Sequence, residues 1–150
     1  GTRNRKSKES SGETKVYNIR RLRCDHCCRI HHELPDFLIP YKRYEAECIE
    51  SVLTNPSTHA VPADESTLYR WFVWFNDFVD YWIHCLKSIM LRTTLEKVPL
   101  NLTSANSETA LLRIGRLVGN APKWLGRIVR PIVNFNLWLH TRSAFLSEDS

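Results

Sequence analysis

The stretch Cys24-Asp25-His26-Cys27-Cys28-Arg29-Ile30-His31-His32 concentrates the residue types that bind metal ions. Cys24 and Cys27 are separated by two residues, and two thiolates at that spacing can hold one tetrahedral metal ion while the backbone turns tightly between them. Such a pair is one knuckle of a zinc ribbon, and a complete ribbon has two. We expect zinc as the cofactor, and the candidate ligands are Cys24, Cys27, His31 and His32.

The source of the remaining ligands is open, since Cys28, Cys48 or a second chain can also supply them. Two interpretations need no metal. In the first, the thiols are free in a loop and the histidines lie at the surface. In the second, a cysteine and a histidine form a nucleophilic pair, but nothing else in the sequence supplies an orienting acid or an oxyanion site. Five cysteines, three of them clustered, indicate reduced thiols and a metal knuckle rather than a disulfide framework.

Basic residues are concentrated at both ends of the chain. Residues 1–29 hold nine Lys and Arg against three acidic residues, and residues 109–142 hold six basic residues and no acidic one. The stretch between them is acidic, and the net charge is +5. Two basic segments on a small protein favour a polyanionic partner. The alternative is that both are charged faces that only keep the protein in solution.

Three groups of residues are therefore candidates for DNA contacts. Arginines beside the knuckle and in the C-terminal segment can contact phosphates, which position a protein without reading sequence. Polar side chains in the first turns of a long helix can reach base edges in the major groove. The candidates are Arg20, Arg21, Arg23 and Arg29; Ser66, Thr67, Tyr69 and Arg70; and Arg113, Arg116, Arg127 and Arg130.

These residues must be positioned by secondary structure that the sequence pattern predicts. Residues 16–24 alternate as in a β-strand, and Ser11-Gly12-Glu13 suits the tip of a hairpin whose other arm is residues 2–8. Pro35 and Pro40 make residues 33–40 an extended connector. Helices are predicted at 41–53, from a cap at Asp64 or Ser66 to Leu91, from Ser107 to Gly119, and from Pro122 to about residue 140 with a kink at Pro131.

The predicted fold class is mainly α: a short N-terminal β-hairpin that forms a partial zinc ribbon, then a helical bundle with a helix-turn-helix-like unit and one long helix. The predicted domains are residues 1–40 and 41–150. The helices on either side of the loop 54–63 form the helix-turn-helix candidate, although that loop is longer than the usual turn. An ordinary helical hairpin is the alternative. The turn at residues 119–122 is a second candidate.

Several function classes have no support in the sequence. The chain has no Gly-rich phosphate loop, no H-E-x-x-H motif and no paired carboxylates on a strand, so we expect neither an enzyme nor a small-molecule substrate. No apolar run approaches the roughly 18–20 residues that cross a bilayer, and the N-terminus lacks an apolar signal region. We expect no membrane partner and a cytoplasmic, nucleoid-associated location.

A resemblance follows from the run RRLRCDHCCRIHHELPDFLIPYKRYEAECIE, Arg20 to Glu50, and from the segments 66–71 and 134–147. The run closely resembles an uncharacterised bacterial family described as a domain of unknown function. It is also similar to the N-terminal DNA-binding parts of insertion-sequence transposases, in which a zinc ribbon precedes a helix-turn-helix. The resemblance implies that Cys24 and Cys27 form the second knuckle. The sequence departs from the pattern in lacking a first knuckle and in carrying Cys28 where Gly is usual.

The sequence thus predicts a non-catalytic DNA-binding accessory or regulatory protein linked to a mobile element, with DNA as partner and a homo-oligomer as a further option. The alternative is a protein-interaction module that dimerises through the aromatic helix 66–91. The exposure of Trp74 and Trp82 discriminates between them, because a partner must cover these rings if they face solvent.

Overall fold

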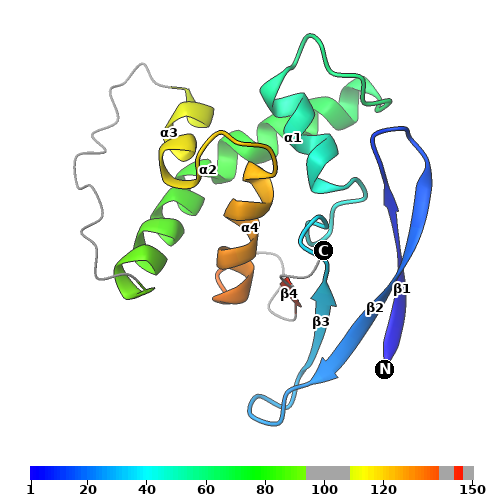
Figure 1. Ribbon diagram of the computed structural model, residues 1–150, viewed down its shortest axis with the longest axis vertical. Helices are drawn as coiled ribbons and strands as arrows, with labels where there is room; N and C mark the ends of the chain where they lie inside the picture. The colour runs from blue at the N-terminus through cyan, green and yellow to red at the C-terminus, as the bar shows by residue number, and fades with distance from the viewer. Residues whose placement is uncertain (94–108, 139–143, 147–150) are drawn as a thin grey trace.

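The computed structural model describes residues 1–93 and 109–138, and the backbone of residues 144–146. In chain order its elements are β1 (Thr2–Lys8), β2 (Thr14–Arg23), β3 (Ile30–Leu34), α1 (Ala46–Thr54), α2 (Glu65–Thr93), α3 (Ala110–Val118), α4 (Trp124–Asn134) and β4 (Ala144–Leu146). Figure 1 shows the hairpin β1–β2 beside α1, and the turn between β2 and β3 at the end of the sheet away from that helix.

The strands form one sheet in the order β1-β2-β3-β4, antiparallel except for the parallel pair β3–β4. The predicted hairpin is confirmed, with Thr2 opposite Arg20 and Lys8 opposite Thr14. Gly12 in its turn has a φ of 85°, a left-handed conformation that glycine adopts without steric cost. A Cβ atom on Gly12 would lie 2.9 Å from Cγ of Pro62, so the hairpin tip rests closely on the loop before α2.

The fold is mixed α/β and roughly as predicted, with an N-terminal sheet before four helices among the described residues, but the sheet is larger than the expected hairpin. Strand β3 occupies residues that were interpreted as metal ligands and connector. Its five residues, Ile-His-His-Glu-Leu, do not alternate between apolar and polar, so the sequence carries no strand signal there. Helix α1 begins at Ala46 and not at residue 41, because the segment before it pairs with β1: the Lys8 N–H donates to the Arg43 carbonyl at 2.7 Å, and the Glu45 N–H donates to the Lys8 carbonyl at 3.0 Å.

The long helix is confirmed as α2, and Asp64 is its cap. The Asp64 Oδ1 atom accepts a hydrogen bond from the Thr67 N–H at 2.8 Å. Hydrogen bonding to the Thr67 side chain, and then to this N–H, lowers the pKa of Asp64. Thr109 caps α3, and its Oγ1 atom accepts from the Leu112 N–H at 3.3 Å. The predicted cap, Ser107, lies outside the described residues. Gly119, at a φ of 81°, ends α3 as expected.

Helix α4 begins at Trp124, two residues after Pro122, and ends at Asn134, three residues after Pro131. The expected continuation to about residue 140 does not occur over residues 135–138. The helix ends because Asn136 adopts a left-handed conformation, with a φ of 58°, and the Leu137 N–H then donates to the Ile132 carbonyl at 2.9 Å.

One buried cluster joins the sheet to the helices. Ile19, Leu34, Leu38 and Ile39, from the N-terminal part, belong to the same cluster as the apolar faces of α1, α2, α3 and α4. Trp74 and Trp82 are both buried inside this chain, at 9% and 2% exposure. These two rings are therefore covered within the chain and need no partner to cover them. Among the described residues, no helix is both long enough and apolar enough to span a membrane.

Candidate metal centre and nucleic-acid interface

Three metal-binding side chains meet at the turn between β2 and β3. The donor atoms of Cys24, Cys27 and His31 all lie within 4.8 Å of one another, and the Cys27 Sγ atom lies 3.1 Å from Nε2 of His31. Cys24 follows the last residue of β2, and His31 is the second residue of β3. The pairing of the two strands thus brings the histidine back to the two thiols, and the cluster can bind a metal ion.

The backbone of the turn supports the first thiol. The Cys24 N–H donates to the Arg29 carbonyl at 2.9 Å, and the Cys28 N–H donates to the Cys24 carbonyl at 2.9 Å, which closes the loop. The Cys27 N–H points at the Cys24 Sγ atom, at 3.5 Å. This backbone hydrogen bond is the main cause of a lowered pKa at Cys24, followed by the Cys27 side chain. A stabilised thiolate is the form that binds metals.

Cys28 adopts a left-handed backbone conformation, with a φ of 58°. This conformation costs a side-chain-bearing residue roughly 1–2 kcal/mol, which explains why glycine is usual at this position of the ribbon pattern. The turn thus keeps the backbone conformation that glycine prefers, and Cys28 adopts it at a cost in strain.

Replacing Cys28 with glycine should raise the free energy of unfolding by about 0.5–1 kcal/mol, because the relieved strain exceeds the extra chain entropy that glycine loses on folding. Urea unfolding measures the difference. The control is Cys28→Ala, which removes the thiol but keeps the left-handed cost and should give no increase. Equal stabilisation by alanine and glycine would contradict the explanation from strain.

The other expected ligands lie elsewhere. His32 is the neighbour of His31 on β3, so its side chain points to the opposite face of the sheet. There its pKa is lowered by burial first and then by the positive charges of Arg3 and Arg21. Cys48 is buried on α1, and its thiol donates to the Lys8 carbonyl at 3.7 Å. Neither residue belongs to the three-donor cluster.

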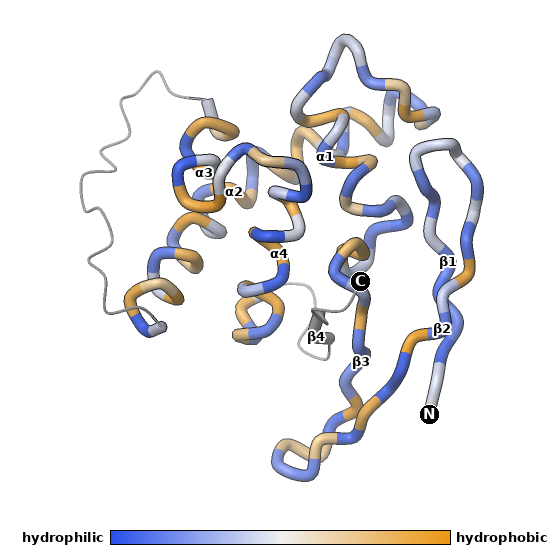
Figure 2. The backbone as a smooth tube through the Cα atoms, in the orientation of Figure 1, coloured by the Kyte–Doolittle hydropathy of each residue, from blue (hydrophilic) through white to orange (hydrophobic). Residues whose placement is uncertain are grey.

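The sheet face that carries His32 opens into a basic cleft of about 340 Å³ between β1 and the segment before α1. Of the described residues that line this basic cleft, none is acidic. Most of its polar lining is cationic, and Figure 2 shows how hydrophilic β1 is along its length. The lining residues are Arg3, Asn4, Arg5, Lys6, Ile19, His32, Leu34, Pro40, Tyr41, Lys42 and Arg43.

Arg5 builds the wall of this cleft. Its guanidinium donates to the Ile39 carbonyl at 2.5 Å and to the Lys42 carbonyl at 3.0 Å, so β1 holds the segment 39–42 in place. Burial, and then the charge of Arg3, lower the pKa of Arg5. The exposed cations Arg3, Lys6 and Arg43 are left to face solvent at the rim.

A second cleft, of about 650 Å³, continues from the first. The two share Tyr41, Lys42 and Arg43, and the second reaches the first turns of α2. We call it the aromatic cleft because three rings line it together with four cations. Its lining residues are Lys8, Tyr41, Lys42, Arg43, Tyr44, Pro62, Asp64, Thr67, Arg70 and Trp71.

Only some of the candidate DNA-contact residues at the start of α2 line the aromatic cleft. Thr67 and Arg70 line it, whereas Ser66 and Tyr69 do not. Ser66, Tyr69 and Arg70 are exposed, and the Ser66 hydroxyl donates to Oδ1 of Asp64 at 3.4 Å. The start of α2 thus borders a cationic surface, as a groove-reading element would need to.

The arginines beside the knuckle are all exposed but face different ways. Arg21 and Arg23 share the sheet face of Ile19 and His32, although neither lines the basic cleft. Arg20 lies on the other face, where it forms an ion pair with Glu33 on β3. Arg29 lies in the turn that follows the knuckle.

Three of the four C-terminal arginines are engaged inside the fold. Arg113 pairs with Asp80 at 2.6 Å and Arg130 with Asp36 at 2.5 Å. The guanidinium of Arg127 donates to the carbonyls of Val118, Pro122 and Ala121 and so fastens the turn between α3 and α4. Arg116 is exposed and also has an interaction partner. The C-terminal arginines, which were expected to contact DNA, therefore make contacts within the chain.

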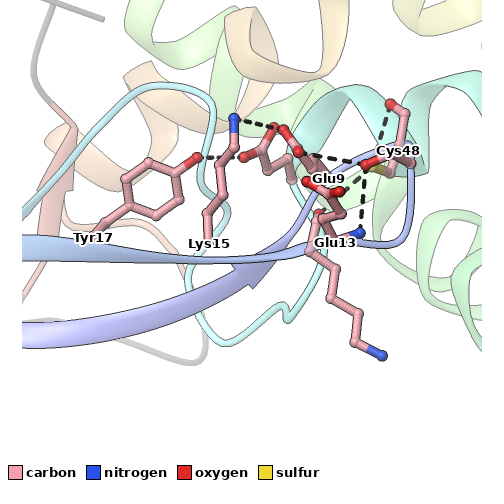
Figure 3. Close-up of polar contacts among 9 residues, drawn as sticks. Glu9, Glu13, Lys15, Tyr17 and Cys48 are labelled. Carbon is pink, nitrogen blue, oxygen red and sulfur yellow. Dashed lines mark hydrogen bonds and ion pairs between the residues drawn. The ribbon is translucent and has the colours of Figure 1, made fainter.

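The hairpin that carries the clefts is fixed to α1 near its tip (Figure 3). The Tyr17 hydroxyl donates to Oε1 of Glu45 at 2.6 Å, and burial, followed by this carboxylate, raises the pKa of Tyr17 to about 12. Lys15 pairs with Glu9 at 2.7 Å across the hairpin, and the Ser10 hydroxyl lies 3.7 Å from the Cys48 thiol. The contacts of Tyr17 and Ser10 hold the hairpin against Glu45 and α1.

The residues that line the basic cleft on β1 and in the segment 42–43 were not singled out from the sequence. The signal for them was the excess of positive charge in residues 1–29, but charge alone does not indicate which side chains of a strand face a cleft. The contact between β1 and residues 39–45 decides that.

Comparison with known proteins gives one family. Residues 1–71 match a family described as a domain of unknown function (DUF6431). The matched region contains the hairpin, the three-donor cluster, both clefts and the first turns of α2. No curated protein and no solved structure matches the chain.

Proposed function

We propose that this chain is a non-catalytic DNA-binding protein, and that the basic cleft contacts the phosphate backbone. The observation that carries the proposal is the lining of that cleft: it combines Arg3, Arg5, Lys6, Lys42 and Arg43 with no acidic residue among the described ones. Like charges gathered on a concave surface repel one another unless an anion neutralises them, and a run of phosphates supplies that charge at regular spacing.

The start of α2 is the element that we propose to reach the bases. It lies at the end of the cationic surface, and Ser66, Tyr69 and Arg70 are exposed there. Helices α1 and α2 would then serve as a helix-turn-helix-like pair, with residues 55–64 as an extended turn. The resemblance to the DNA-binding parts of insertion-sequence transposases supports this assignment and a link to a mobile element.

We also propose that the three-donor cluster binds zinc. Two thiolates and one imidazole are a ligand set that zinc prefers, and a four-coordinate ion leaves one position for a further donor. The ion would hold the turn between β2 and β3 rigid, and with it the arginines Arg21, Arg23 and Arg29. Its contribution to DNA binding would be the placement of these charges.

Fluorescence anisotropy with a random-sequence duplex at several salt concentrations tests the proposal. The double variant Arg3→Glu/Lys6→Glu should lower affinity at least tenfold and reduce the salt slope by about 2, since each lost phosphate contact removes about 0.9 from that slope. The control is Arg92→Glu, an exposed charge at the far end of α2. Absence of binding by the unaltered chain at low salt, or equal losses in both variants, would sink the proposal.

A further inference from the structure

Tyr41 stands out at the junction of the two clefts. It is the most exposed of the large apolar side chains among the described residues, at 73%, and it lines both clefts. Its φ of 63° is left-handed, which is rare for a bulky residue and is sustained only where the surrounding structure imposes it. The folded chain therefore leaves the Tyr41 ring exposed, and the left-handed backbone at Tyr41 costs strain.

The segment that presents Tyr41 is rigidly held by β1. Arg5 donates to the carbonyls on either side of it, those of Ile39 and Lys42. The Ser7 hydroxyl, at 3.2 Å, and the Lys8 N–H, at 2.7 Å, both donate to the Arg43 carbonyl. An exposed ring on so well fixed a backbone loses little further entropy when a flat ligand stacks on it.

The aromatic cleft beside this ring has the chemistry of a nucleotide site. Tyr44 and Trp71 pack edge to face, with ring centroids 5.0 Å apart, and form its apolar wall. Lys8 lies 5.5 Å from the Tyr44 ring centroid and Lys42 lies 4.3 Å from that of Trp74, so two of its cations are already placed over rings. Arg43 and Arg70 are exposed at the rim, and the one acid, Asp64, caps α2.

We propose that the aromatic cleft binds an unpaired nucleotide, with its base stacked on Tyr41 and its phosphate contacted by Arg43 and Arg70. This inference rests on the proposed function for the adjoining basic cleft, and it adds the state of the DNA. Both faces of a base inside a duplex are covered by neighbouring bases, so only a base in a single-stranded segment can stack on a protein ring. The chain would therefore bind single strands, or a duplex that ends in one.

The test uses the full chain and fluorescein-labelled 12-residue oligothymidylate, compared by anisotropy with an abasic strand of the same length. The two strands carry the same phosphates, so any preference measures the bases. The unaltered chain should prefer oligothymidylate at least fivefold, Tyr41→Ala should abolish that preference and leave abasic-strand binding unchanged, and Tyr41→Phe should retain it. The matched control is Phe135→Ala, which removes a ring of 42% exposure at the end of α4 that lines neither cleft.

Tyr41→Gly is the second variant, because glycine tolerates the left-handed backbone and removes the ring without strain. It should lose the preference as alanine does. Equal affinity of the unaltered chain for the two strands, or an unchanged preference in Tyr41→Gly, would overturn the stacking proposal while leaving phosphate binding intact. No binding to either strand or to a duplex would overturn the proposed function as well.

Discussion

Replacing His31 with alanine should lower the zinc affinity of the chain at least about 100-fold, whereas replacing His32 should leave it unchanged. Loss of a residue that only supports a metal ligand commonly costs 10–100-fold in affinity, so loss of a direct ligand should cost more. The structure separates these neighbours sharply. The His31 Nε2 atom lies 3.1 Å from the Cys27 thiol, while His32 lines the basic cleft on the opposite face of β3.

Titration with Co²⁺ measures the difference, because thiolate coordination gives an absorption band that does not depend on DNA binding. Competition with a chelator then gives the zinc affinity. Cys27→Ser should behave like His31→Ala, since each removes one of the three clustered donors. The pair His31→Ala and His32→Ala differs by one position on one strand, so general damage to the sheet affects both. Equal loss of metal in the two histidine variants would contradict the assignment of His31.

His31 and His32 also show what the sequence alone does not predict about the metal site. The knuckle residues and their spacing are legible in the sequence, because cysteines two residues apart have few other uses. Which histidine completes the cluster depends on whether residues 30–34 are a strand, since side chains alternate only in a strand. That strand was not predicted, and so both histidines remained candidates until the pairing of Leu22 with His31 and of Arg21 with His32 was known.

The fold was predicted best where local signals agree. The hairpin follows from alternation over residues 16–24 and from the turn signal Ser11-Gly12-Glu13, and α2 follows from apolar positions spaced three and four apart over its length. The start of α1 was predicted too early. Residues 41–45 have a helical pattern, but β1 offers the Arg43 carbonyl and the Glu45 N–H tertiary hydrogen bonds that replace the helical ones. Tertiary contacts of this kind override local propensity and leave no local trace.

The basic C-terminal segment illustrates a different limit. Arg130 was a candidate phosphate contact, yet it pairs with Asp36, 94 residues away along the chain. Arg127 is occupied by three carbonyls at the end of α3 and the following turn. An arginine on a helix has the same appearance in the sequence whether it holds a phosphate or a neighbouring helix end. The clefts on the N-terminal side, where exposed cations line a concavity, are the stronger candidates for that reason.

Truncating Trp82 to alanine should lower the free energy of unfolding by about 3–5 kcal/mol, the range measured for large aromatic residues in protein cores. Trp82 is buried at the centre of a group of rings from α2 and the segment after α4. Its ring centroid lies 4.9 Å from that of Trp74, 5.9 Å from that of Phe75 and 5.6 Å from that of Trp138, on which it stacks. Removal of the ring leaves a cavity that side chains from two elements must collapse to fill.

Urea unfolding followed by circular dichroism measures the change, and two controls give it meaning. Trp82→Phe keeps a ring and should lose clearly less, whereas Val73→Ala alters a 38% exposed position on the same helix and should change stability by less than about 0.5 kcal/mol. The same experiment also tests the alternative function, in which α2 is a protein-interaction surface. If Trp82 served a dimer contact, truncation would disrupt association at a modest cost in monomer stability. If the ring instead joins α2 to Trp138 within one chain, its removal must destabilise that chain. A small loss of stability in Trp82→Ala would therefore support α2 as an interaction surface.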